Sequence, residues 1–225
     1  MKLYALLIAS AILFAGCVST PKRVNKEYLK DMSDEQVEKI ESIELQIITI
    51  TDEKVKVSKA ISKTKNTVKI TKGDISVLKS KIDAFEDKET LYTESKDNEK
   101  LAETKKELKK LRADLKMQKL KLEYFEAKED NQDETIELKE IALSTKISDQ
   151  YYEEAKIARA NQDKALGPVA EGEEDKNRIP VTEYEEYHKN QKDKLKSQAK
   201  DQRKSVRIQK KAETKLKANG YTGEL

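Results

Sequence analysis

Apolar residues recur every three or four positions after residue 33, which is the spacing of one face of an α-helix. In a heptad frame, the a positions run from Ile40 to Ile82 and the d positions from Ile43 to Phe85. Eleven of these fourteen seam positions are apolar. A repeat of this length predicts a long helix with a coiled-coil seam.

The composition of the seam indicates how many helices meet. Most of its residues are β-branched at both a and d, a pattern that favours trimers or larger bundles over dimers. Five apolar residues lie off the seam and widen the apolar face: Leu45, Ile48, Val55, Ile70 and Val77. We therefore expect this helix to pack against more than one neighbour, from the same chain or from another.

Polar stretches and caps divide the rest of the chain. Ser33 and Gln36 have the spacing of a capping box at the start of the first helix. Residues 86–99 lose the apolar seam, which predicts a turn between antiparallel helices; a continuous exposed helix is the alternative. A second periodic segment begins at Leu101, and its apolar stripes are expected in the core. Residues 128–134 are polar again and are either a break or solvated helix.

The only body segment with several glycines and prolines, 166–181, predicts a loop before the last helix. Thr182 and Glu185 repeat the capping-box spacing, so we expect a helix over 182–219 and a tail over 220–225. The expected seam of this helix is sparse: Tyr184, His188, Gln191, Leu195, Gln198, Gln202, Val206, Gln209 and Leu216.

Composition supports a helical fold. The chain has only six Gly and three Pro in 225 residues, and residues 74–166 contain neither. The sequence therefore predicts an all-α fold of elongated antiparallel helical hairpins, or a coiled-coil bundle of three to four long helices. The long helical hairpin region is expected over 33–165.

Charge is balanced overall but uneven along the chain. Lys and Arg total 46 and Asp and Glu total 43, so bulk charge does not indicate a binder of polyanions. Residues 123–186 nevertheless carry a net charge of −11, and residues 189–217 carry +9. The basic helix either folds back beside the acidic stretch or docks on anionic lipid, a phosphate polymer or an acidic protein. Its candidate interaction residues are Lys204, Arg207, Lys210 and Lys211.

Four tyrosines flank the predicted loop: Tyr151, Tyr152, Tyr184 and Tyr187. Core packing is the simpler interpretation, and a recognition patch that includes Tyr184 and Tyr187 is the alternative. The basic helix has no aromatic residues among its lysines, so we expect no nucleic-acid binding.

Residues for catalysis or metal binding are scarce. The chain has a single histidine, His188, and a single cysteine, Cys17. It has no G-x-S-x-G elbow, and its scattered glycines do not form a phosphate loop. We expect no enzymatic activity, no metal, no cofactor and no small-molecule substrate.

The N-terminus has the pattern of an export signal. Lys2 precedes an apolar run from Leu3 to Phe14, which is too short to span a bilayer. Small residues, Ala15 and Gly16, then precede Cys17. This arrangement resembles the lipobox of bacterial lipoproteins, in the permissive form of spirochaetes. An ordinary secretory signal with a chance cysteine is the alternative.

The resemblance implies cleavage between Gly16 and Cys17 and attachment of lipid to Cys17. It predicts a signal peptide over 1–16, a lipidated flexible tether over 17–32, and a membrane-anchored exported protein. Val18 follows the cysteine where a retention signal would have Asp, which by analogy favours the outer membrane, at its periplasmic face or at the cell surface.

Together these observations predict a lipid-anchored helical protein of the cell envelope that acts as a scaffold, spacer or protein-interaction module. Its expected partners are the membrane, through Cys17, and a protein partner or a second copy, through its helices. A surface-exposed adhesin or host-ligand-binding lipoprotein is the alternative.

Overall fold

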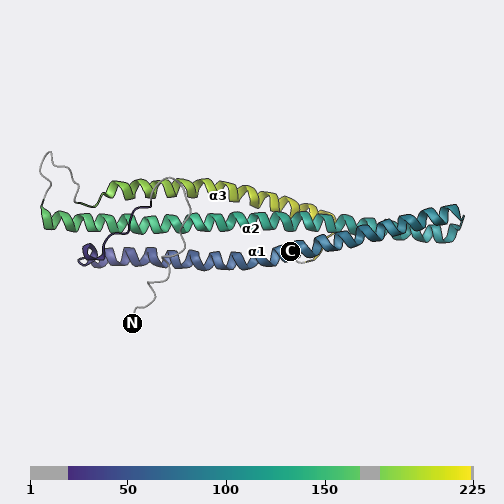
Figure 1. Cartoon of the computed structure of the whole chain (residues 1–225), viewed down its shortest axis with the longest axis horizontal. Coiled ribbons are helices and arrows are strands. Elements are labelled where there is room, and N and C mark those ends of the chain that lie inside the picture. The colour runs from purple at the N-terminus through teal and green to yellow at the C-terminus, as the bar shows by residue number, and fades with distance from the viewer. Residues whose placement is uncertain (1–19, 168–177, 224–225) are drawn as a thin grey trace, which may run out of the picture. The chain divides into compact units, whose positions relative to one another are not determined.

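The computed structural model describes residues 20–167 and 178–223, and all regular structure in these ranges is helical (Figure 1). Three long helices, α1 (Asp34–Glu94), α2 (Asn98–Leu166) and α3 (Val181–Ala218), pack against one another, and a short 3-10 helix, η1 (Lys26–Leu29), precedes them. The all-α prediction is confirmed. The predicted signal peptide, Cys17 and most of the Gly/Pro loop lie outside the described residues.

The chain divides into two compact units, and each contains a part of every long helix. Unit 1 comprises residues up to Ile43 together with Ile147–Gln191. Unit 2 comprises Glu44–Lys146 and the residues from Lys192 onward.

The capping box predicted at the start of α1 is present. The Ser33 backbone N–H donates to Gln36 Oε1 at 2.9 Å, and the Gln36 N–H donates to Ser33 Oγ at 3.3 Å. These reciprocal bonds satisfy backbone groups that have no partner within the helix.

The predicted seam of α1 faces the protein interior. None of its fourteen positions is exposed, and Ile47, Ile61 and Thr71 are among the most buried. The five off-seam apolar residues are instead exposed; Leu45 and Ile70 retain 64% and 66% of their accessible surface. They do not widen the packed face within this chain, because they lie on heptad positions that point away from the seam.

The turn between α1 and α2 is much shorter than the predicted range 86–99. Helix α1 continues to Glu94, and only three residues separate it from α2. Lys96 adopts a positive φ of 58°, and the Asp97 N–H donates to the Tyr92 carbonyl at 3.1 Å. Asp97 Oδ1 then accepts the Lys100 N–H at 3.2 Å, which caps the start of α2.

The polar stretch 128–134 is uninterrupted helix within α2. Several of its polar side chains have partners on the neighbouring helices. Asn131 Nδ2 donates to Gln209 Oε1 of α3 at 2.6 Å, and Glu129 lies 3.8 Å from Lys65 Nζ of α1. A polar sequence does not break the helix here because both neighbours offer complementary groups.

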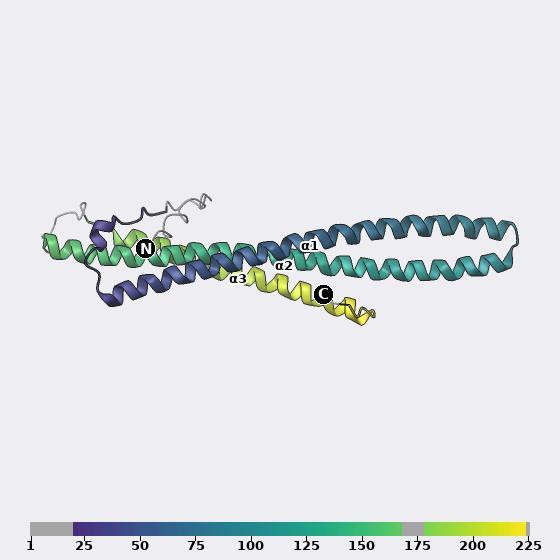
Figure 2. The same cartoon turned by 90° about the horizontal axis from the view of Figure 1, so that it is seen from below.

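In unit 2, ion pairs join α1 and α2 in reverse order of sequence. They include Lys54 and Glu140 at 2.7 Å, Lys72 and Glu126 at 2.8 Å, and Glu86 and Arg112 at 2.8 Å. The residue numbers rise on α1 as they fall on α2, so the two segments run in opposite directions, as Figure 2 shows.

Helix α3 of unit 2 packs on α2 through a small apolar cluster. Its members are Leu120, Tyr124, Ala127, Ala212 and Leu216. The packed face differs from the predicted seam: Ser205 and Ala212, which the seam does not include, are buried, whereas Val206 is 40% exposed. In a helix as polar as α3, a few isolated apolar residues are not enough to predict which side is buried.

The two ends of α3 differ in how well they match their predicted signals. The helix begins at Val181, so Thr182 lies in the first turn and not at the cap position expected for it. At the other end, Gly220 has a φ of 92°, and its N–H donates to the Lys217 carbonyl at 3.0 Å. Glycine adopts this left-handed conformation readily, and it ends the helix where the sequence predicts.

Candidate interaction surfaces

The N-terminal segment of unit 1 packs against its helices. Val24 is buried with Ala155, Ala158 and Tyr184 in one apolar cluster. The Tyr184 hydroxyl donates to the Lys22 carbonyl at 2.6 Å. Residues 20–32 were expected to form part of a flexible tether, yet the structure holds them by apolar burial and hydrogen bonds.

An ion pair between the half-exposed Arg23 and the buried Glu154 reinforces this attachment. Arg23 donates from Nε to Glu154 Oε2 at 3.1 Å and from its terminal nitrogen to Oε1 at 2.7 Å. Glu154 is only 1% exposed and accepts a third bond, of 3.1 Å, from Gln150. A carboxylate buried this deeply needs a charged and hydrogen-bonded partner, and the planar fork of arginine provides both.

The ends of the Gly/Pro loop are also fixed within unit 1. Arg178 donates to the Gly167 carbonyl at 2.6 Å and pairs with Asp163. Gln162 Oε1 accepts the backbone N–H of Ile179 at 2.9 Å. These contacts join the last turn of α2 to the residues that lead into α3.

The single histidine lies in a polar cluster that contains the residue types of a hydrolase triad. His188 Nδ1 is 3.1 Å from Asp149 Oδ1 and 3.2 Å from Ser148 Oγ, and its ring stacks on Tyr152 with centroids 5.5 Å apart. A triad requires the acid on one ring nitrogen and the nucleophile on the other. Here both groups contact the same nitrogen, so the geometry does not support nucleophilic catalysis.

Among the described residues, no group of three or more His, Cys, Asp or Glu side chains is placed to hold a metal ion. In the same ranges, none of the helices combines the length and the apolar character needed to cross a membrane.

The tyrosines proposed as a recognition patch are buried. Tyr184 and Tyr187 are each 7% exposed, and burial raises the pKa of the Tyr184 hydroxyl. They belong to the packing of unit 1, as the simpler interpretation of the sequence has it.

The basic candidates on α3 are all exposed in unit 2. Lys204 pairs with Asp201 of its own helix at 2.6 Å. Arg207, Lys210 and Lys211 lie on the same outer part of the helix, and Lys211 borders the groove described below.

Helix α3 does lie beside the acidic stretch of α2, but few of its cations take part. Lys215 pairs with Glu123 at 2.6 Å. Further along, the contact is made by an uncharged amide: Gln198 donates to Glu134 and Glu137 at 2.8 and 3.0 Å. The glutamines of α3 face α2, so most of its lysines and arginines are left to face solvent.

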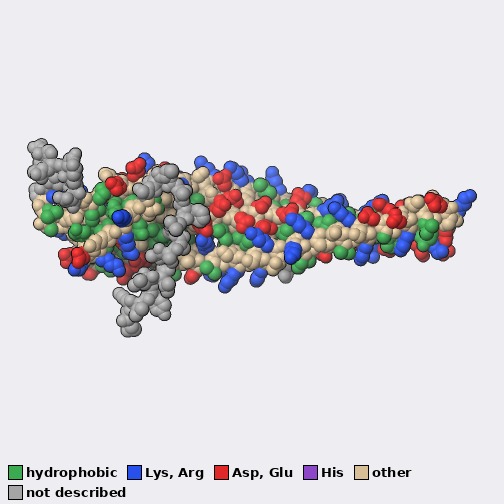
Figure 3. Space-filling view, in the orientation of Figure 1, with side chains coloured by type: hydrophobic (Ala, Val, Ile, Leu, Met, Phe, Trp, Pro, Cys, Tyr) green, Lys and Arg blue, Asp and Glu red, His purple; other side chains and the backbone are tan. Residues whose placement is uncertain are grey.

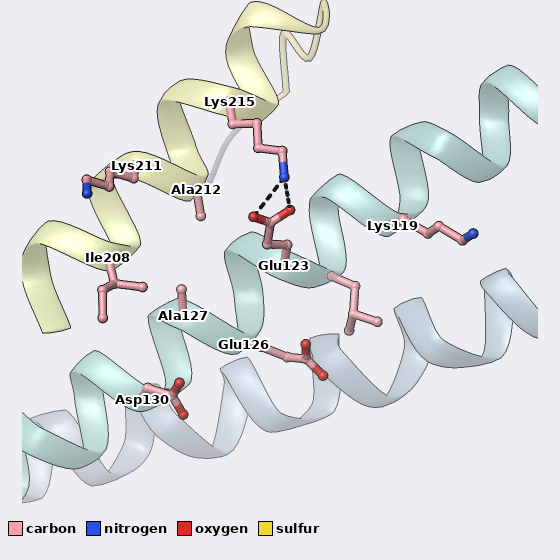
Figure 4. A pocket seen from close by; sticks show the side chains of 10 residues that line it. Lys119, Glu123, Glu126, Ala127, Asp130, Ile208, Lys211, Ala212 and Lys215 are labelled. Carbon is pink, nitrogen blue, oxygen red and sulfur yellow. Dashed lines mark hydrogen bonds and ion pairs between the residues drawn. The ribbon is translucent and has the colours of Figure 1, made fainter.

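A groove of about 620 Å³ runs between α2 and α3 in unit 2. Its apolar lining is Leu122, Ala127, Ile208 and Ala212, and charged side chains surround it. Figure 4 shows Lys215 meeting Glu123 at one end, with Ile208 and Ala212 facing Ala127. Its polar groups do not converge on a point, as those of a substrate site do, so the groove resembles an incompletely filled helix interface.

No family model, no curated protein and no solved structure matches this chain. The interpretation of its surfaces therefore rests on the residues themselves.

Proposed function

We propose that this protein is a lipid-anchored α-helical component of a bacterial cell envelope, acting as a scaffold, spacer or protein-interaction module. The observation that carries the proposal is the lipobox-like run Leu13-Phe14-Ala15-Gly16-Cys17. Lipidation of Cys17 would supply the two or more acyl chains that stable membrane attachment requires.

The packing of the N-terminal segment gives this anchor a mechanical consequence. Lys22, whose carbonyl is already bound to Tyr184, follows Cys17 by five positions. A fully extended chain of this length spans at most about 18 Å. A lipid on Cys17 would therefore hold unit 1 close to the membrane surface and would not leave it on a long tether.

The helical body fits a scaffold or spacer. We propose that its helices form an antiparallel coiled-coil bundle in which α1 and α2 make a hairpin. Support comes from the inward-facing heptad seam of α1 and from the ordered ion pairs between α1 and α2. The exposed off-seam residues, such as Leu45 and Ile70, are where self-association or a protein partner would be sought.

Lipidation is tested by substituting the cysteine. Wild-type protein and Cys17→Ala are expressed in a bacterial host with a clickable palmitate analogue, and Ser19→Ala serves as a control outside the lipobox. We expect acyl label and membrane fractionation for the wild type and the control. Cys17→Ala should lose the label and accumulate as an uncleaved or soluble form. A wild type without label that still fractionates with membranes would refute the lipid anchor.

The adhesin alternative has one observation in its favour, the exposed cations of α3. Treating intact cells with protease distinguishes the two roles. Protection of the whole chain supports a periplasmic scaffold, whereas loss of the α3 region without lysis supports a protein exposed at the cell surface.

A further inference from the structure

One side of α3 in unit 2 carries a continuous row of cations. The members of this α3 basic face are Lys192, Lys196, Lys200, Arg203, Arg207, Lys210 and Lys217. At 100° per residue they fall within an arc of about 120°, and at 1.5 Å per residue the row is about 38 Å long. All seven are exposed.

The α3 basic face points away from the packing of the helix. The buried positions of α3, including Ser205, Ala212 and Leu216, lie on the opposite side of the helical wheel. Figure 3 shows Lys and Arg side chains gathered along the outer edge of α3. The row is therefore not part of the contact with α2.

Most of this charge is not neutralised within the chain. Residues 192–217 contain eleven Lys or Arg and three Asp or Glu. Lys196 pairs with Asp193 one turn away, but both side chains are largely exposed, so the pair is weak. Lys200, Arg203 and Arg207 have no acidic partner within 4 Å in the described ranges of the chain.

A comparison with α1 shows a different use of cations. Residues 54–73 of α1 contain seven lysines and no acidic residue. Three of those lysines, Lys54, Lys65 and Lys72, reach carboxylates of α2. Part of the cations of this α1 segment thus contributes to the contact with α2, whereas none of the α3 basic face does.

The chemistry of the face indicates the kind of partner. It contains five lysines, two arginines and no aromatic residue. The centres of protein interfaces are depleted of lysine and enriched in aromatic residues, so an acidic protein fits poorly. A straight row of long cationic side chains suits a plane that bears many mobile phosphates, and anionic lipid surfaces attract such residues strongly.

We propose that the α3 basic face binds the phosphate groups of an anionic phospholipid surface. This contact is separate from the lipid on Cys17 and does not depend on it. It would lay the α3 segment of unit 2 along the membrane.

The test uses the full chain carrying Cys17→Ala, so that acylation plays no part. Binding is measured by flotation with vesicles of phosphatidylcholine alone or of phosphatidylcholine mixed with phosphatidylglycerol. We expect binding that needs phosphatidylglycerol and that falls steeply between about 0.1 M and about 1 M salt, where the screening length shortens from about 10 Å to about 3 Å. This result does not require any variant to fold.

The site is located by neutralising four of its residues together: Lys200→Gln, Arg203→Gln, Arg207→Gln and Lys210→Gln. The matched control neutralises four exposed lysines of α1: Lys56→Gln, Lys59→Gln, Lys63→Gln and Lys69→Gln. Because each lysine or arginine near an anionic surface contributes about fivefold, we expect the α3 variant to lose at least about tenfold in partitioning and the control under about threefold. Circular dichroism verifies that both stay helical.

Three results would overturn the proposal. One is binding of the Cys17→Ala chain that does not depend on phosphatidylglycerol, and another is an equal loss for the two quadruple variants. The third is salt-sensitive binding to poly-glutamate without binding to the vesicles, which would assign the face to an acidic protein. None of these results bears on palmitate labelling at Cys17, so the two proposals fail independently.

Discussion

Removing the charge of Arg23 tests how the N-terminal segment is held in unit 1. Loss of one partner from a buried ion pair costs about 3–5 kcal/mol, because the remaining charge stays buried. Glu154 is buried, but the Arg23 side chain is 46% exposed, so water can reach the vacated position. Glu154 also keeps its bond from Gln150. We therefore expect Arg23→Gln to lower the free energy of unfolding by about 2 kcal/mol.

The measurement is a double-mutant cycle by urea denaturation followed by circular dichroism. It uses Arg23→Gln, Glu154→Gln and the double variant, and the expected coupling is about 1.5–3 kcal/mol for a charged hydrogen-bonded pair. The control cycle uses Lys39 and Glu153, an ion pair in the same unit whose lysine is 57% exposed. Exposed pairs of this kind couple by about 1 kcal/mol or less.

A coupling for Arg23 and Glu154 no larger than that of the control pair would refute this reasoning. It would mean that the bidentate contact does not hold the segment. A second readout is independent of global stability: detachment of residues 20–32 in Arg23→Gln should speed tryptic cleavage within this segment, where Lys26 and Lys30 are exposed.

Three further predictions concern packing, capping and acid sensitivity. Leu216→Ala removes a fully buried side chain and should cost about 2–5 kcal/mol, whereas Leu45→Ala, at an exposed position, should stay within about 0.5 kcal/mol; urea midpoints measure both. Ser33→Ala should cost about 1 kcal/mol through loss of the helix cap, seen as a lower midpoint of thermal unfolding. Burial raises the pKa of Glu153, but hydrogen bonds and attraction from two lysines outweigh it and leave the pKa below its ordinary value. A carboxylate whose pKa is lowered in the folded state stabilises the protein above its unfolded-state pKa, and this stabilisation is lost as the pH falls through the folded-state pKa. Wild type should therefore lose its stability advantage over Glu153→Gln on acidification. An advantage that persists at low pH would contradict this.

Helix starts and stops with strong local signals were predictable, and those that depend on neighbours were not. The reciprocal bonds of Ser33 with Gln36 and the left-handed Gly220 involve only groups within a few residues of each other. The stretch 128–134 is helical because Asn131 and Glu129 find partners on other helices. A local pattern contains no information about those partners.

The candidate sites divide in the same way. The sequence singled out the basic residues of α3, and their exposure agrees with that choice. It also proposed Tyr184 and Tyr187 as a patch, but both are buried. No local signal marked Arg23 and Glu154, which lie 131 residues apart.

The sequence by itself determined the helical class, the heptad seam of α1 and the uneven charge, because helical periodicity and charge are properties of neighbouring residues. The resemblance of the N-terminus to a lipobox also rests on the sequence alone, since Cys17 lies outside the described residues. Only the tertiary structure decided which charged side chains form ion pairs between helices. Lys54 and Lys72 of α1 reach acidic side chains of α2, whereas α3 meets α2 through glutamines and a small apolar cluster. Which side of a polar helix is buried depends on the surface that it packs against, and for this reason the α3 basic face is left in solvent.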